Sequence, residues 1–492
     1  MESIKALERA WIRNRALTRE ILDDVVRSTY SYALRLASTP TLKTRTGIRV
    51  DIAPQTEDFR RQFSALMTRL SDNGIVYPES GKAFQGVGTL AYSGKWRRPS
   101  LVEAYPEVAR LLNNALSFVF RAHPELDEYA IQNALSQKAL VLALGGGGAT
   151  GYAHICLFKW LAECHIQPEL ITGTSFGALL GYARSLSRDY DAAMTMLKLP
   201  GYWKIFKNIH PCLGTGRHGL MGICRIDIQS LCDNFWQSLG YTQAPSFDEL
   251  PIPFAAVSSG ILNASRIAEE IEPNTALRSL SGLLRLSQLT WKRATRHAAQ
   301  IARLIMQHQN AVTPVVFGFD KQTQPMCAID GVAFSALVPG VLNAEIPAAH
   351  RQSRDIVDKI FHDRDLYRLT DGGLTSNVPV RTAYEEVKRD RIRTQNVWIL
   401  GLDVFAPQAC DGAFYPLQQI ANENALIDAV YADSFVRLKY LLSPMELAPT
   451  LPRMHWLNLK FRKAFDDEMK VIQYAVQKLL PLKALDLSGF GD

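Results

Sequence analysis

The chain has 492 residues, of which 55 are Lys or Arg and 48 are Asp or Glu, so its formal net charge at pH 7 is +7. This mild positive excess is far below that of a nucleic-acid-binding protein, and no nucleic-acid partner is expected. The seven cysteines lack C-x-x-C spacing, which argues against a zinc site and predicts reduced thiols in a cytosolic compartment.

The length and the hydrophobic share of 47% suit one large α/β domain with helical additions. The amino-terminal sequence is charged from its second residue, and no apolar run approaches 18 residues. We therefore expect neither a secretory signal peptide nor a transmembrane segment. The expected location is the cytoplasm or the membrane periphery.

Residues 1–136 are predicted to be mostly helical. Apolar residues recur at helical spacing over 18–37, 57–71 and 108–121, and loops containing Gly and Pro separate these segments. The sequence has no long linker after them, so this region is expected to pack against the rest of the protein.

A buried strand and a glycine-rich loop are predicted next. Residues 139–144 (ALVLAL) form a continuous apolar run, which is typical of a parallel strand covered on both faces. Four glycines, 145–148, follow and precede a helical pattern. Such a loop leaves backbone N–H groups unshielded at the positive end of the helix. It can therefore hold an anion, either a phosphate or the oxyanion of an acyl-transfer intermediate.

Other interpretations of this loop remain. Gly146, Gly148 and Gly151 satisfy the G-x-G-x-x-G dinucleotide fingerprint, but the next strand ends without the carboxylate that would hold a ribose. A P-loop would need a Lys-Ser/Thr pair after the last glycine, and none is present. A tight turn without a ligand is the third possibility. An oxyanion-binding loop is the interpretation that best explains this glycine cluster together with a second glycine cluster later in the chain.

That second glycine cluster surrounds Ser175. Residues 169–172 (ELIT) predict a short strand, residues 178–183 (ALLGYA) begin a helical pattern, and Gly173 and Gly177 flank the serine. A G-x-S-x-G sequence between a strand and a helix is typical of a nucleophile elbow, in which the glycines let the serine occupy a strained, exposed turn. The pentapeptide alone is common in long proteins, so an ordinary loop serine is the alternative.

Residues 281–310 lie in a predicted insertion, 275–325, and contain no acidic residue. Their basic residues Lys292, Arg296 and Arg303 fall with Arg285 on one helical face, opposite an apolar face that includes a tryptophan. A basic amphipathic helix of this kind can lie on an anionic lipid surface. An ordinary surface helix packed on the core is equally compatible with the pattern, and both interpretations stay open.

Asp371 is the best candidate for the base that activates the serine. Serine hydrolases usually use a histidine, but none of the ten histidines follows a late strand in a recognisable context. Asp371 instead ends a short predicted strand and is followed by Gly372 and Gly373. An Asp-Gly-Gly sequence by itself is ordinarily a turn.

The predicted core extends over 137–408, with a late strand at 397–404, and residues 409–492 are predicted to be helical again. The three glycine-containing motifs together resemble those of the patatin-like phospholipases. They are GGGATGYAH at 146–154, GTSFG at 173–177 and DGGLTSNVP at 371–379.

The resemblance implies an α/β fold, with a mostly parallel sheet sandwiched by helices, and a phospholipase A-type lipid acyl hydrolase that uses a Ser–Asp dyad. Carried over to this chain, Ser175 is the nucleophile and Asp371 is the general base and acid. The expected oxyanion hole is Gly146, Gly147 and Gly148, and the expected supporting glycines are Gly151, Gly173, Gly177, Gly372 and Gly373. No cofactor or metal is implied. The implied partner is a phospholipid or another acyl-ester lipid, and the need for a protein activator is left open.

The chain departs from the family pattern in two places, and one of them is residues 275–325, which form a longer segment than the compact family core needs. The other is a single position. The family often has Lys or Arg where this chain has Thr150, so any electrostatic contribution of that cation is absent. Two other functions stay open: a catalytically silent binding or scaffold protein of the same fold, and a nucleotide-binding α/β protein that uses the GGGATG loop.

Overall fold

A computed structural model provides the structure of the chain. It describes residues 24–43, 49–70, 98–126, 138–194, 209–214, 217–220, 222–226, 236, 239–263, 304, 307–389, 391–392, 397–405, 415–438, 470 and 472. The predicted amphipathic helix lies almost entirely outside these residues, so the structure does not test it.

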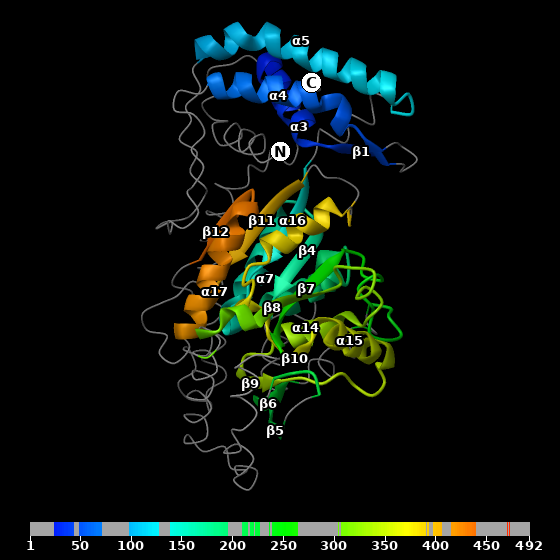
Figure 1. Cartoon of the computed structure of the whole chain (residues 1–492), viewed down its shortest axis with the longest axis vertical. Coiled ribbons are helices and arrows are strands. Elements are labelled where there is room, and N and C mark those ends of the chain that lie inside the picture. The colour runs from blue at the N-terminus through cyan, green and yellow to red at the C-terminus, as the bar shows by residue number, and fades with distance from the viewer. Residues whose placement is uncertain are drawn as a thin grey trace. The chain divides into compact units, whose positions relative to one another are not determined.

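The chain forms two compact units (Figure 1). The first comprises residues 1–141, 385–399 and 475–492, and the second comprises residues 142–384 and 400–474. The division into three regions at 136 and 408 remains a prediction.

In the part of the first unit that the structure describes, three helices form most of the fold. They are α3 (Asp24–Ser38), α4 (Ala53–Arg69) and α5 (Arg98–Ala122). Each overlaps one of the helical segments predicted from the spacing of apolar residues. A short antiparallel ribbon of β1 (Thr41–Lys43) and β2 (Arg49–Asp51) connects α3 to α4.

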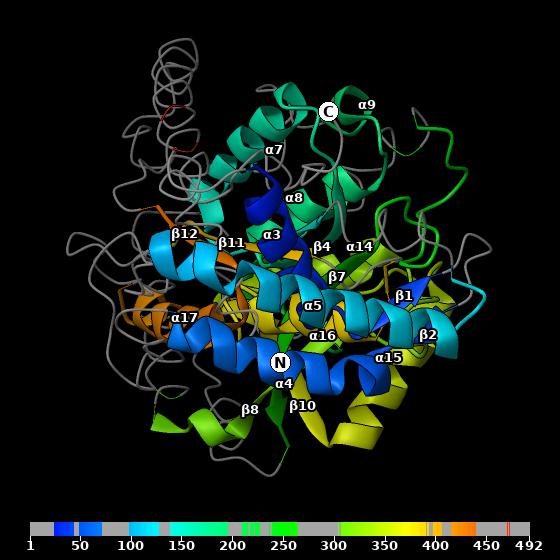
Figure 2. The same ribbon diagram turned by 90° about the horizontal axis from the view of Figure 1, so that it is seen from above.

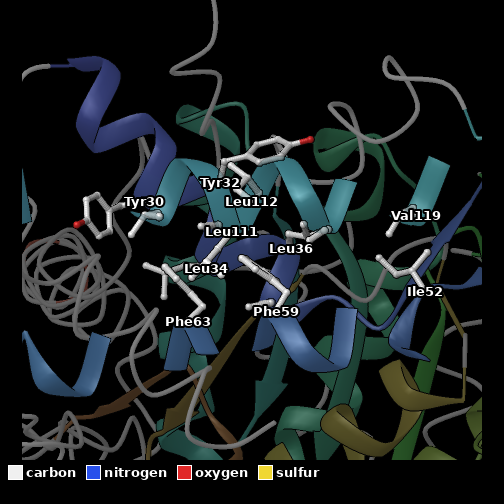
Figure 3. Close-up of a cluster of buried hydrophobic side chains, with 14 of the residues drawn as sticks. Tyr30, Tyr32, Leu34, Leu36, Ile52, Phe59, Phe63, Leu111, Leu112 and Val119 are labelled. Atoms are coloured by element: carbon white, nitrogen blue, oxygen red, sulfur yellow. The ribbon is translucent and has the colours of Figure 1, made fainter. Parts of the chain in front are cut away.

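Apolar side chains from these helices form one buried cluster, shown in Figure 3. Phe59 and Phe63 of α4 stack with ring centroids 5.4 Å apart. The Tyr30 hydroxyl of α3 is buried but donates a 2.8 Å hydrogen bond to the carbonyl of Leu101 in α5. The unit therefore has its own hydrophobic core with its buried tyrosine hydroxyl satisfied.

The second unit contains a seven-stranded sheet among the described residues. Its order is β10-β7-β4-β3-β11-β12, and β8 also pairs with β7. The strands are β3 (Ala139–Leu144), β4 (Pro168–Thr174), β7 (Phe254–Leu262), β8 (Val312–Phe317), β10 (Leu366–Asp371), β11 (Val397–Asp403) and β12 (Ser434–Arg437).

Helices flank this sheet, as Figure 1 shows and Figure 2 shows from above. They are α7 (Ala153–Glu163), α8 (Phe176–Ser185), α14 (Ala328–Ser335), α15 (Arg351–Arg364), α16 (Val380–Lys388) and α17 (Tyr415–Asp428), with the short α9 (Tyr190–Met194) after α8. Short 3₁₀ segments are η1 (Gly148–Tyr152), η4 (Gln309–Ala311), η5 (Gly372–Leu374) and η7 (Ala429–Tyr431). A separate small sheet has the order β5 (Ile209–Gly214), β6 (Gly222–Ile226) and β9 (Gly340–Asn343). The predicted α/β class, with a mostly parallel central sheet between helices, is confirmed.

Two strands of the main sheet lie outside the predicted core or inside its predicted insertion. β8 falls within 275–325 but pairs antiparallel with β7, so this part of the segment belongs to the sheet. β12 falls in the region predicted to be helical but pairs in parallel with β11. Helical periodicity cannot distinguish a four-residue edge strand from the end of a helix, because the hydrogen-bonding partner is remote in sequence.

Candidate active site

The ends of β4 and β10 meet on β7. Thr174, the last residue of β4, pairs with Val257, and Asp371, the last residue of β10, pairs with the adjacent Ser258. β8 already occupies the other edge of β7 over 256–261, so β4 and β10 approach along the same edge from opposite directions. The sheet therefore brings the serine motif and the aspartate motif together although nearly 200 residues separate them in the chain.

Ser175 follows β4 in a strained backbone conformation, with φ 54° and ψ −125°. A residue with a Cβ rarely adopts positive φ, and such strain clusters at functional sites. The Ser175 amide donates a 2.8 Å hydrogen bond to the Ser335 hydroxyl oxygen at the end of α14. Ser335 is itself buried, and its hydroxyl donates to the carbonyl of Val257. Ser335 therefore ties the strained turn to the sheet.

Close backbone approach explains two of the predicted motif glycines. A Cβ on Gly177 would lie 2.4 Å from the carbonyl oxygen of Leu144, the last residue of β3. A Cβ on Gly372 would lie 2.0 Å from the carbonyl oxygen of Val257. Both separations are impossible for real side chains, so these turns can only reach their positions beside the sheet with glycine.

Hydrogen bonds fix both the backbone and the side chain of Asp371. The Asp371 amide donates a 2.8 Å hydrogen bond to the carbonyl of Leu337, and the carboxylate Oδ1 accepts a 2.8 Å bond from the Gly373 amide. Burial raises the pKa of the Asp371 carboxyl to about 6, although its interactions with the Ser175 side chain and the Gly373 amide favour the ionised form. The carboxyl is thus a far better proton acceptor near neutral pH than an ordinary aspartate.

The glycine loop leaves two amides available. The Gly145 amide donates to the carbonyl of Leu402 at 2.9 Å, and the Gly146 amide donates to the carbonyl of Asn377 at 3.1 Å. Among the described residues, the amides of Gly147 and Gly148 donate to no protein acceptor. Of the three predicted oxyanion-hole glycines, two therefore have an amide available for a ligand. The Gly146 amide is already bonded to the carbonyl of Asn377.

Gly146 nevertheless lies directly against the nucleophile. A Cβ built on it would be 3.0 Å from the Ser175 Cβ and 2.9 Å from Oδ1 of Asn377. Asn377 is 1% exposed, so its side chain is enclosed beside the serine and the glycine loop. In the sequence, Asn377 stands within the DGGLTSNVP motif, and its pattern predicted no role for it.

Two side chains brace the glycine loop. The Thr150 hydroxyl lies 2.7 Å from the carbonyl oxygen of Gly147 and 2.8 Å from that of Val404. His154 Nε2 donates to the carbonyl of Gly145 at 2.7 Å. Burial lowers the pKa of His154 to about 4 despite this bond, so the ring is neutral at pH 7 and supports the loop. Thr150, which stands where the family often has a cation, thus contributes a hydrogen-bonded anchor.

The family comparison agrees with this geometry. Residues 142–384 match the sequence model described as "Patatin-like phospholipase". These residues form a patatin-like phospholipase domain. The match covers both β4 with its serine turn and β10 with Asp371, and it confirms the resemblance inferred from the three motifs.

Three curated relatives are each similar to less than a quarter of this chain. Patatin-like phospholipase domain-containing protein 7 of Rattus norvegicus is 35% identical over 95 residues, 19% of this chain and 6% of that protein. Lysophospholipase nte1 of Emericella nidulans is 43% identical over 118 residues, 22% of this chain and 8% of that protein. Patatin-like phospholipase domain-containing protein 6 of Homo sapiens is 38% identical over 85 residues, 16% of this chain and 6% of that protein. The matched segments span less than a tenth of these relatives.

The described part of the chain contains no helix of the length and hydropathy needed to span a bilayer.

Proposed function

We propose that this protein is a serine acyl hydrolase of phospholipase A type that cleaves acyl esters of membrane phospholipids with Ser175 and Asp371. One observation carries the proposal: Ser175 occupies a strained turn at the end of β4, beside an aspartate whose pKa burial raises to about 6. The family match and the names of the relatives support a lipid ester as the substrate class.

The chemistry follows from the two side chains. Asp371 accepts the Ser175 hydroxyl proton while the serine oxygen attacks the ester carbonyl carbon. The protonated carboxyl then gives that proton to the departing alcohol oxygen, which leaves an acyl-serine. Water repeats the sequence: Asp371 takes its proton, the hydroxide oxygen adds to the acyl carbon, and the fatty acid leaves as Ser175 recovers its proton.

The negative charge that develops on the carbonyl oxygen needs donors. The amides of Gly147 and Gly148 supply them in this proposal, at the start of η1, where the positive end of a short helical segment adds a favourable field. Gly146 has no side chain, so it leaves room beside Ser175. The motif segments contain no carboxylate or His/Cys cluster, so the hydrolysis itself is proposed to run without a metal ion.

Substituting either partner tests the proposal. Ser175→Ala and Asp371→Asn should fold normally and lose ester hydrolysis on phospholipid vesicles by similar large factors, because the two groups act as one unit. A fluorophosphonate probe should label the wild-type protein and not Ser175→Ala. Asp363→Asn, which changes an exposed aspartate of α15, is the matched control and should keep full activity.

Two outcomes would contradict the proposal. Substantial activity in Asp371→Asn, together with loss of activity in a histidine variant, would show a hidden triad in place of the dyad. Absence of both hydrolysis and probe labelling in the wild-type protein would instead favour a catalytically silent binding protein of the same fold.

A further inference from the structure

A cysteine, an aspartate and a histidine come together at the start of two helices. Cys327 is the N-cap residue of α14, Asp330 lies in its first turn, and His350 is the N-cap residue of α15. One possible ligand atom from each, the thiol sulfur, a carboxylate oxygen and a ring nitrogen, lie within 4.8 Å of one another. None of the three belongs to the dyad or to the glycine loop.

We propose that Cys327, Asp330 and His350 bind a divalent metal ion of the zinc class. Thiolate sulfur, imidazole nitrogen and carboxylate oxygen are the donors that zinc takes in proteins, and three protein ligands plus water complete its tetrahedral shell. Calcium and magnesium are unsuitable, because they select oxygen ligands. The inference is independent of the proposed ester hydrolysis.

The imidazole and the carboxylate are spaced almost as zinc ligands are. His350 Nδ1 lies 2.9 Å and 3.1 Å from the two carboxylate oxygens of Asp330. Two ligands bound to one tetrahedral zinc at ordinary Zn–N and Zn–O lengths are about 3.3 Å apart. These two groups would therefore separate by a few tenths of an ångström, and the thiol sulfur, which lies within 4.8 Å of both, would move to the Zn–S distance of about 2.3 Å.

The donor groups are presented together. Asp330 is 1% exposed, and its carboxylate lies 2.9 Å from His350 Nδ1. Cys327 and Asp330 both lie at the N-terminal end of α14, so one helical turn positions two of the three proposed ligands. On binding, the thiol and imidazole protons would leave to solvent, and the metal would take their place.

The backbone of the ligands is fixed by hydrogen bonds. The Cys327 amide donates to the Ser353 hydroxyl oxygen at 2.9 Å, and the Asp330 amide donates to the carbonyl of Cys327 at 3.1 Å. The carbonyl of His350 accepts from the Arg354 amide at 3.2 Å. A preformed arrangement of this kind binds a metal with little loss of conformational entropy.

Two of the proposed ligands are partly exposed. A surface hollow of about 660 Å³ is lined by neighbours in sequence of Cys327 and His350, Pro325 and Arg351 among them, but by none of the three ligands. Cys327 is partly exposed and the His350 side chain is 18% exposed. The proposed ligands are thus within reach of an ion from solvent.

The position in the fold indicates a stabilising role. α14 begins at the proposed ligands and ends at Ser335, which accepts the hydrogen bond from the Ser175 amide. A metal would fix the first turn of a helix that is buried along its whole length. It would raise the stability of the protein by binding only the folded state, and it would not touch the reacting atoms.

Cobalt provides a direct test on the full-length protein. After chelator treatment and desalting, titration with Co²⁺ should give a near-ultraviolet sulfur-to-metal charge-transfer band that saturates at one equivalent and disappears on addition of Zn²⁺. Zn²⁺ alone should raise the unfolding temperature. Cys327→Ser should remove the band, and His350→Gln should weaken binding at least tenfold.

Cys164→Ser is the matched control, because Cys164 is another partly exposed free cysteine away from the cluster. It should keep both the band and the Zn²⁺ effect on stability. Circular dichroism and the metal-free unfolding temperature verify that each variant folds. Absence of the band in folded wild-type protein, or its persistence in folded Cys327→Ser, would overturn the assignment. Because these measurements need no substrate, they succeed or fail separately from the hydrolase proposal.

Discussion

Ser175 holds a backbone conformation, φ 54° and ψ −125°, of a kind that costs about 1–3 kcal/mol in a residue with a Cβ. Asp371 adds a second unfavourable feature, because its carboxyl is buried enough to raise its pKa to about 6. Ser335 and the Gly373 amide hold the two residues in these states. Strain and burial at one place are expected where a serine must be presented to a substrate beside a base.

The raised pKa of Asp371 makes a pH prediction. A base must be ionised to accept a proton, so kcat/KM should fall about tenfold per pH unit below an apparent pKa near 6 and level off above it. The measurement should use a soluble short-chain ester, so that the ionisation of lipid head groups does not contribute. A profile without a break between pH 5 and 7, or with its break near 4, would contradict the role of burial at Asp371.

At the scale of elements, the loop between β3 and η1 is held by its neighbours in the fold. The Gly145 amide donates to the carbonyl of Leu402, and the Gly146 amide donates to the carbonyl of Asn377. The Thr150 hydroxyl bonds the carbonyl of Gly147, and the His154 ring bonds the carbonyl of Gly145. Of the four glycine amides at 145–148, those of Gly147 and Gly148 remain for a ligand among the described residues. A single-residue change at Gly147 therefore tests the loop with little effect on the sheet.

Gly147→Ala should lower kcat by roughly 10²–10³. Gly147 has φ −170° and ψ 3°, outside the left-handed region. The Cβ of an alanine there would lie 2.6 Å from Cγ2 of Val404 and 2.7 Å from Oγ1 of Thr150, which forces the amide to move. Hydrolysis kinetics measure the loss of kcat. Vesicle binding, measured in parallel, should be the same as for the wild-type protein.

The same variant separates the oxyanion interpretation from the nucleotide interpretation. Calorimetry should detect no NAD or ATP binding to the wild-type protein. Micromolar nucleotide affinity that is lost in Gly147→Ala, with ester hydrolysis intact, would refute the oxyanion role of the loop.

At the scale of the whole molecule, the buried Asp371 carboxylate should reduce the free energy of unfolding. A carboxyl whose pKa is about 6 in the folded protein and 3.8 otherwise stabilises the fold while protonated, and this contribution is lost as the pH rises through 6. At pH 8 the loss amounts to about 1–3 kcal/mol. Asp371→Asn keeps the shape without the charge, so it should be more stable than the wild-type protein.

Thermal unfolding at pH 8 and pH 4.5 checks this expectation. The unfolding temperature of Asp371→Asn should exceed that of the wild-type protein by several degrees at pH 8, and the difference should shrink to roughly a third of that value at pH 4.5, where an unfolded-state carboxyl is already mostly ionised. Asp363→Asn, at an exposed position, should show no such difference at either pH. If Asp371→Asn were less stable than the wild-type protein at pH 8, the interactions of the carboxylate would stabilise the fold by more than its burial destabilises it.

The sequence by itself determined the class of fold, the family of the central domain and the candidate residues Ser175 and Asp371. These features are local: an apolar run followed by glycines predicts a buried strand and a tight turn from the residue types within one segment. The three motifs were recognisable for the same reason, since each one is contained in fewer than ten consecutive residues.

Only the tertiary structure decided which groups meet. β8 and β12 were missed because a short strand is defined by a remote partner, and Gly146 was included among the oxyanion donors because its acceptor, the carbonyl of Asn377, lies far along the chain. The roles of Ser335 and of the cluster of Cys327, Asp330 and His350 were invisible for the same reason. Hydrogen bonds and ligand sets join atoms in space, whereas sequence patterns report only the spacing along one segment.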